Sequence, residues 1–161
     1  MDAISLLTKD HETVSKLFRE HERADEAKKA GLFERIRGEL EVHAQIEERI
    51  FYPALRRAQG PALAVQVGEA VREHQDVKSL LRSLTGLQAG NLDYDAKFRQ
   101  IVQNVEHHVQ EEEGEMFPQA RTLLGEDRLR TLGAEMMALK QTLSVGGAVP
   151  RALQAVGAVG G

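Results

Sequence analysis

Apolar residues recur along most of the chain at alternating steps of three and four, the spacing of one face of an α-helix packed in a bundle. The pattern runs through four long segments, at about residues 3–24, 26–58, 61–84 and 92–123. A shorter amphipathic segment follows at about Glu126–Thr142, with four apolar side chains on one face: Leu129, Leu132, Met136 and Leu139. The pattern therefore predicts four long helices and a short fifth helix.

Breaks in the pattern mark where these helices end. Gln59-Gly60-Pro61 separates the second segment from the third, and proline suits the first turn of a helix. Gly86 and Gly90, in the stretch that ends at Asn91, mark the end of the third segment. Pro53 and Pro118 lie inside the second and fourth segments, where proline should bend a helix or end it early. Because the connections are short, we predict an all-α, up-down-up-down four-helix bundle.

The end of the chain has a different composition from the rest. Residues 144–161 are rich in glycine and include one proline, a composition that does not favour a packed core. We therefore predict one bundle domain over residues 1–143, which includes the fifth helix, and a flexible tail over residues 144–161.

Composition and charge narrow the class of protein. The chain has 161 residues, of which 42% are hydrophobic and 29% charged, as in a globular domain. A net charge of −4 argues against nucleic acid as a partner. No apolar run reaches membrane-spanning length, and the first residues lack the pattern of a signal peptide, so we expect a cytoplasmic protein. The absence of cysteine excludes disulfides, thiolate metal sites and cysteine nucleophiles.

Polar residues with metal-binding side chains interrupt the apolar stripes. The sequence HAQIEERIFYP at residues 43–53 is repeated as HVQEEEGEMFP at residues 108–118. Each copy places glutamate four residues after histidine, which puts His43 and Glu47, or His108 and Glu112, on one face of a helix. Single histidines, His11 and His74, fill the same gap in the first and third segments.

A lone histidine on an apolar stripe is more often a hydrogen-bonded core residue than a ligand, but one on each of four helices favours a shared site. Unpaired ionised glutamates on buried stripes would each cost several kcal/mol, which a raised pKa or a bound cation could offset. Six groups are too many for one zinc ion, which prefers four ligands. Nitrogen and oxygen donors without sulfur suit two iron or manganese ions. The candidate ligands are His11, His43, Glu47, His74, His108 and Glu112.

The order His11, His43-x-x-x-Glu47, His74, His108-x-x-x-Glu112 resembles the hemerythrin-like, or HHE, cation-binding domains over about residues 3–123. The resemblance implies a four-helix bundle with a non-haem, oxo-bridged centre of two iron ions. It favours iron over manganese or zinc as the metal. It also implies that the six candidate residues are the ligands and that the two glutamates bridge the metals.

One position departs from the oxygen-carrying hemerythrins, which have a second histidine four residues from the first on the third helix. Here the corresponding residues are Ala70 and Lys78, so a coordination position is left open to water, an external ligand or a substitute. Five nearby side chains are better explained by hydrogen bonding or solvent exposure than by ligation: His21, Glu48, Tyr52, His107 and Glu113. The missing nitrogen disfavours reversible oxygen carriage and favours redox chemistry on a small ligand.

Three functions remain from the sequence. The first is a di-iron protein that binds, senses or reacts with oxygen, peroxide or nitric oxide, and enzymatic redox activity is one form of it. The second is an iron donor for the repair of iron–sulfur proteins, although the related repair proteins carry a cysteine-bearing domain that is absent here. The third is a non-enzymatic bundle with a structural metal. No protein partner is indicated, and no serine lies in the context of a catalytic triad.

Overall fold

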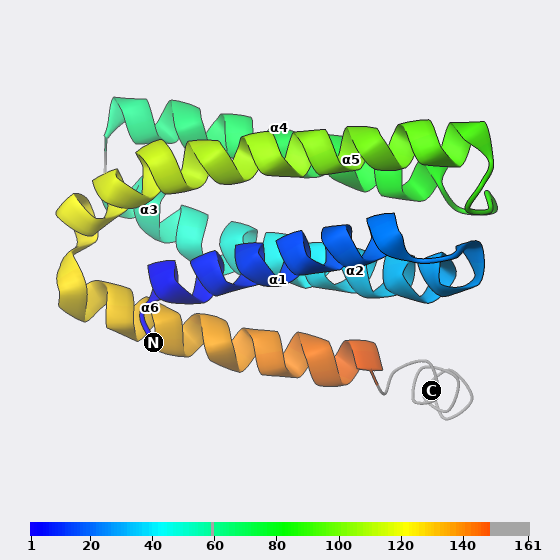
Figure 1. The fold of residues 1–161 in the computed structure, drawn as a ribbon. Helices are drawn as coiled ribbons and strands as arrows, with labels where there is room; N and C mark the ends of the chain where they lie inside the picture. The colour runs from blue at the N-terminus through cyan, green and yellow to red at the C-terminus, as the bar shows by residue number, and fades with distance from the viewer. Residues whose placement is uncertain (59, 149–161) are drawn as a thin grey trace, which may run out of the picture.

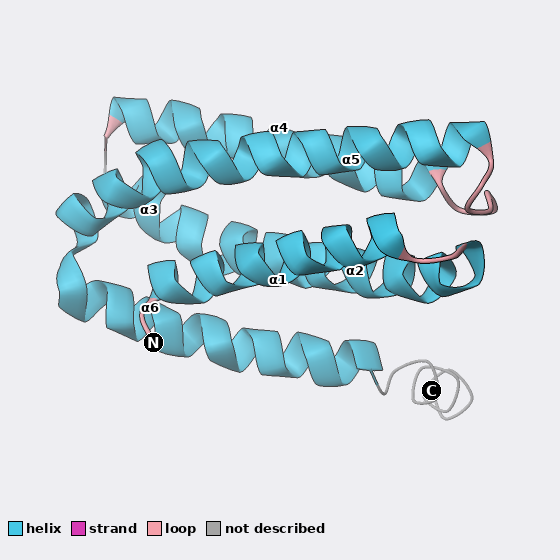
Figure 2. Cartoon of the chain, viewed as in Figure 1, coloured by secondary structure: helices cyan, strands magenta, loops and turns pink. Residues whose placement is uncertain are grey.

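The computed structural model describes residues 1–58 and 60–148, which are almost entirely helical and contain no strand (Figures 1 and 2). The predicted all-α class and the helical bundle are confirmed. The helical segments, in chain order, are α1 (Ala3–Arg23), α2 (Glu26–Ile46), η1 (Glu47–Phe51), α3 (Tyr52–Ala58), α4 (Pro61–Ser83), α5 (Leu92–Glu111), η2 (Glu112–Met116) and α6 (Phe117–Ala148). Both η segments are π-helical.

The long helices lie in two pairs. α1 packs beside α2 and α4 beside α5, and side chains from all four helices share a buried core (Figure 1). Gly125 lies inside α6 with φ 76° and ψ 167°, a conformation that glycine adopts without strain. The chain turns there, and the remainder of α6 runs back along α1 and α2 (Figure 1).

α6 extends past the predicted boundary between bundle and tail at residue 143. α6 continues to Ala148, so residues 144–148 are helical. Glycine costs a helix only about 1 kcal/mol relative to alanine, so a helix can run through Gly146 and Gly147. Residues 149–161, the rest of the predicted tail, lie outside the described residues.

Short polar side chains begin three of the helices. Asp2 accepts a hydrogen bond from the Ser5 amide at 2.7 Å, and Asp25 accepts one from the Lys28 amide at 2.9 Å. Asn91 accepts from the Asp93 amide at 2.8 Å, at the start of α5. These bonds satisfy amides that have no partner within their helix. Gly60 and Pro61 begin α4, as the sequence indicates.

The two prolines neither end their helices nor interrupt the chain's helical path. Each follows a π-helical segment, in which Tyr52 N–H donates to the Glu47 carbonyl and Phe117 N–H donates to the Glu112 carbonyl, five residues back. Proline cannot donate a hydrogen bond, and the wider π turn changes the bonding register directly before Pro53 and Pro118. The prolines therefore lie at the start of α3 and α6 as second residues.

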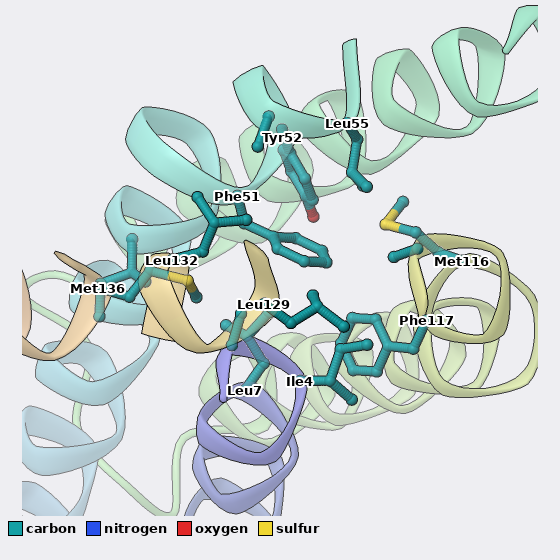
Figure 3. Packing of buried hydrophobic residues seen from close by; sticks show 14 of the residues in the cluster. Ile4, Leu7, Phe51, Tyr52, Leu55, Met116, Phe117, Leu129, Leu132 and Met136 are labelled. Atoms are coloured by element: carbon teal, nitrogen blue, oxygen red, sulfur yellow. The ribbon is translucent and has the colours of Figure 1, made fainter. Parts of the chain in front are cut away.

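Two apolar cores flank the middle of the bundle. The Phe51 core joins α1, the end of α2, the two π segments, α3, α4 and α6. It includes Leu7, Ile46, Phe51, Tyr52, Leu55, Phe117, Leu129 and Leu132. Figure 3 shows how side chains from α1 and from the second part of α6 meet Phe51 and Phe117. The Phe98 core lies among α1, α2, α4 and α5, and includes Val14, Phe18, Phe33, Ile36, Leu81, Tyr94 and Phe98.

His21 lies in the Phe98 core, and its burial predicts a pH-dependent stability. Its ring stacks on Phe98 with centroids 3.7 Å apart, and its Nε2 hydrogen-bonds to the Tyr94 hydroxyl at 2.8 Å. Burial, and then the charge of Lys29, lower the His21 pKa from 6.5 to about 4. Because the unfolded chain binds this proton first, we expect stability to be lost as pH falls from about 6.5 towards about 4.

Urea unfolding of a His21→Gln variant across this pH range should show a weaker pH dependence than the wild type. His107→Gln is a matched control, because the His107 side chain is 67% exposed. If the free energy of unfolding depends on pH equally in the two variants, His21 is not the source of the acid-sensitive stability.

Candidate metal centre

The six residues singled out from the sequence meet in the middle of the bundle. They come from α1, α2, η1, α4, α5 and η2, and their side chains are at most 9% exposed. The residues are His11, His43, Glu47, His74, His108 and Glu112. The structure therefore brings together every residue of the predicted set, although whether each binds a metal stays a prediction.

Their donor atoms form two overlapping groups. One contains His11, His43, Glu47 and Glu112, the other Glu47, His74 and His108, and the atoms of each group lie within 4.8 Å of one another. Glu47 belongs to both. Its Oε1 lies 3.1 Å from His43 Nε2 and 3.0 Å from His74 Nε2.

Glu112 also reaches histidines of both groups. Its Oε1 is 3.1 Å from His11 Nε2 and 3.3 Å from His108 Nε2. The two glutamates thus connect the first helical pair to the second. Such an arrangement can hold two neighbouring cations with shared carboxylates.

A carboxylate contacts the outer nitrogen, Nδ1, of each of the four histidines. Asp10 lies 3.0 Å from His43 Nδ1, and Glu73 lies 2.8 Å from His108 Nδ1. Glu48 lies 2.8 Å from His74 Nδ1, and Glu113 lies 2.6 Å from His11 Nδ1. An ionised carboxylate only accepts, so it holds the proton on Nδ1 and turns Nε2 inward. Metal-bound histidines are typically oriented in this way.

Sequence analysis missed these four carboxylates as a set. Asp10 and Glu73 each precede a histidine, and adjacent residues do not share a helix face. In the structure each contacts the histidine of the neighbouring helix instead. Glu113, predicted to be hydrogen-bonded or solvent-exposed, contacts His11. The available signal was the repetition itself, since an acidic residue precedes His11 and His74, and a second glutamate follows both Glu47 and Glu112.

The two halves of the site differ at one aromatic position. Tyr52 follows the first π segment and stacks on His74 with centroids 5.6 Å apart, while Phe117 follows the second and stacks on His11 at 5.9 Å. The Tyr52 hydroxyl donates to Glu112 Oε2 at 2.7 Å and lies 3.1 Å from Glu47 Oε1. Phenylalanine has no hydroxyl, so only one half of the site supplies this hydrogen bond.

The charges at the site stabilise one another. Burial alone would lower the His43 pKa, but the charge of Glu47 and the hydrogen bond to Asp10 raise it to about 10. Burial opposes ionisation of Glu47, yet the charge of His43 and hydrogen bonds hold the Glu47 pKa well below 4.5. Burial, and then the charges of Glu47 and Glu112, raise the Tyr52 pKa well above 10.0, so its hydroxyl remains a donor. A metal ion would replace the protons held by the histidines.

Two buried atoms at the centre have no hydrogen-bond partner among the described residues. They are His43 Nε2 and Glu47 Oε2. His43 Nε2 lies 3.1 Å from Glu47 Oε1, but the geometry does not make a hydrogen bond. Because a buried polar atom without a partner costs about 1–3 kcal/mol, a cation between these donors fits the site.

The other candidate side chains lie away from the centre. His21 belongs to the Phe98 core, and His107 is exposed and pairs with Glu111. Ala70 is buried in the Phe51 core, and its methyl side chain offers no donor atom. Lys78 lies one helical turn beyond His74 and lines a cavity that reaches the histidines.

This cavity has a volume of about 390 Å³ and is partly open to solvent. It is bounded by all four histidines and by apolar residues of α1, α2, α4 and α5. Neither Glu47 nor Tyr52 lines it, so these two residues lie on the closed side of the centre. A small ligand in the cavity would reach the centre past the histidine rings.

Sequence comparison agrees with this geometry. A model of the hemerythrin HHE cation-binding domain matches residues 2–120, which contain all six candidate ligands and both π segments. The chain belongs to the hemerythrin HHE family. As a member of a cation-binding family with a buried cluster of histidines and glutamates, this hemerythrin-like protein has a site suited to metal ions.

A curated relative extends beyond this domain. A DNA nickase from Nostoc sp. (strain PCC 7120 / SAG 25.82 / UTEX 2576) is 27% identical to the chain over 144 residues. The match covers 89% of the chain but only 40% of that protein, so the chain spans less than half of the relative's length. No solved structure matches the chain. Among the described residues, no helix is both long and apolar enough to cross a membrane.

Proposed function

We propose that this hemerythrin-like protein holds two iron ions and that it binds, senses or reacts with a small oxidant: oxygen, peroxide or nitric oxide. The observation that carries the proposal is the pair of overlapping donor groups that share Glu47 and face a cavity. Nitrogen and oxygen donors without sulfur suit iron or manganese better than a four-coordinate zinc. An up-down-up-down order of α1, α2, α4 and α5, with the second part of α6 as an added helix, is the topology we infer for the bundle.

Each residue has a distinct role in this proposal. His11 and His43 would hold one ion, His74 and His108 the other, and Glu47 and Glu112 would bridge them. Bound iron would supply electrons to the oxidant. Asp10, Glu48, Glu73 and Glu113 keep the histidine rings in position through their Nδ1 contacts.

The surroundings of the centre favour reaction over reversible oxygen carriage. Neither candidate position for a further histidine supplies a ligand, because Ala70 has no donor atom and Lys78 is exposed. The cavity lies on this side of the centre and gives a ligand access to the open position. On the closed side, the Tyr52 hydroxyl donates to Glu112, and the Phe51 core excludes water.

Metal analysis and spectroscopy test the proposal directly. We expect the purified protein to contain about two iron ions per chain, since six nitrogen and oxygen ligands suit two ions. Its near-ultraviolet absorption, assigned to oxygen bound to iron, should change on addition of peroxide or nitric oxide. His74→Ala should lower the iron content, because His74 is one of two histidines in the second group.

His107→Ala provides the control, because His107 is exposed and lies outside both buried groups. Iron content that is the same in the His74 and His107 variants would remove His74 from the ligand set. A spectrum unchanged by every oxidant would leave a structural metal site as the better description.

The Nostoc relative gives a second candidate function, because its name describes DNA nicking. Most of that protein has no counterpart in this chain, and the net charge of −4 provides little attraction for phosphate. Nicking of supercoiled plasmid by the metal-loaded protein, lost when Glu47 is replaced, would favour this candidate.

A further inference from the structure

The cavity beside the histidines is much larger than a diatomic ligand or peroxide requires. Its volume of about 390 Å³ lies in the range of pockets for organic ligands, about 300–1,000 Å³. A water molecule's share of liquid volume is only about 30 Å³. Even with two metal ions at its inner end, most of this space would remain for another molecule.

Apolar side chains from four helices form most of the inner wall. Val14 comes from α1 and Leu40 from α2, Val77 and Leu81 come from α4, and Val105 and Val109 come from α5. These side chains would exclude water from a hydrocarbon chain, and each contributes only apolar surface. The wall therefore suits an aliphatic ligand.

The carboxylates that line the cavity are already engaged. Asp10, Glu48 and Glu73 each contact a histidine Nδ1, and Asp10 also contacts Lys140. Glu41 forms an ion pair with Arg37 at 3.2 Å. None of these four acidic side chains is left without a positively charged or histidine partner.

Two cations that line the cavity lack such partners. Lys78 and Arg49 are both exposed, which places them at the mouth. Across residues 1–58 and 60–148, no ion pair joins Lys78 or Arg49 to an acidic side chain, and Arg49 contacts Gln45 at 3.4 Å. The mouth therefore offers two cations to a negatively charged group.

We propose that the cavity binds a medium-chain aliphatic monocarboxylate. Its hydrocarbon chain lies among the six apolar residues, and its carboxylate lies between Lys78 and Arg49. This proposal deepens the proposed function by naming an organic ligand class for the same site, and it rests on that function only in placing the ligand beside the metals. Binding requires no metal, because the apolar wall and both cations belong to the chain itself.

Calorimetric titration of the protein with hexanoate, octanoate and decanoate tests the proposal, with iron measured in the same samples. We expect one site per chain, and affinity should rise about three- to fourfold for each added methylene group. Octanol, which lacks the charge, should bind more weakly than octanoate. Lys78→Gln should weaken octanoate binding about five- to tenfold through loss of a charge-assisted contact.

Lys16→Gln is the matched control, because Lys16 is exposed on α1 and does not line the cavity. Leu81→Trp places a larger side chain in the cavity and should abolish octanoate binding. If Leu81→Trp fails to fold, Lys78→Gln still tests the proposal. Binding without iron would support this inference while the proposed function fails.

Two outcomes overturn the inference without affecting the proposed function. One is a protein that contains iron and responds to peroxide but does not bind octanoate. The other is octanoate binding that is equal in the Lys78 and Lys16 variants and lost on removal of iron, because the carboxylate would then bind the metal rather than the mouth.

Discussion

Replacing Glu47 with glutamine is expected to remove both metals from the protein at once. Glu47 is fully buried and is the one residue that belongs to both donor groups at the centre. Glutamine keeps nearly the same size but removes the negative charge that offsets two cations. Iron measured after purification should fall to background in Glu47→Gln, whereas His74→Ala should mainly affect the second group.

Glu48→Gln is the matched control for this prediction. The same substitution one residue later removes only the contact to His74 Nδ1, and loss of such an orienting contact weakens metal binding about 10- to 100-fold. Far-ultraviolet circular dichroism should show that both variants remain helical. Retention of one iron ion by Glu47→Gln would show that Glu47 is not a shared ligand.

Replacing Leu132 with alanine should destabilise the fold by about 2–5 kcal/mol, the usual cost of a buried leucine-to-alanine cavity. Leu132 is fully buried where the second part of α6 packs on the Phe51 core (Figure 3). The same core contains side chains of both π segments, which carry Glu47 and Glu112. Packing of α6 therefore also stabilises these two segments. Urea unfolding of wild type and variant measures the change.

Leu92→Ala is the control, because Leu92 is 84% exposed and the same atoms are removed at the surface. We expect a change within about 0.5 kcal/mol for this variant. A similar small effect at position 132 would mean that the second part of α6 does not stabilise the bundle.

The candidate ligands could be predicted because a helix fixes the direction of each side chain. Once the apolar stripes set which face is buried, His11, His43, His74 and His108 must point inward with their partners Glu47 and Glu112. The structure places all six donor groups within two small volumes. The same periodicity predicted the helical bundle.

The carboxylates around the histidines could not be assigned in the same way. Contact between Asp10 and His43 depends on the relative height and rotation of α1 and α2, which one helix's periodicity does not specify. The cavity likewise depends on how four helices pack. Its signal in the sequence was limited to Lys78, one of the two residues, with Ala70, that the resemblance places where a second histidine is expected.

The π segments were missed because the choice between bonding to the fourth or the fifth preceding residue leaves little trace in composition. Phe51 with Tyr52 and Met116 with Phe117 are adjacent buried pairs, but such pairs do not mark a π segment, because the regular helix α1 also buries Leu17 with Phe18. Proline after each pair was read as a bend, although the wider turn accommodates it.

The two π segments repeat a local widening of the helix at matching positions of the doubled motif. A π turn holds one more residue than an α turn, and here it begins at the glutamate of each His-x-x-x-Glu motif, at Glu47 and Glu112. The same one-residue widening therefore follows the same motif position in both halves of the bundle. A single change at the residue that follows this widened turn, Tyr52 in one half and Phe117 in the other, therefore gives the two halves different hydrogen bonding around an otherwise repeated frame.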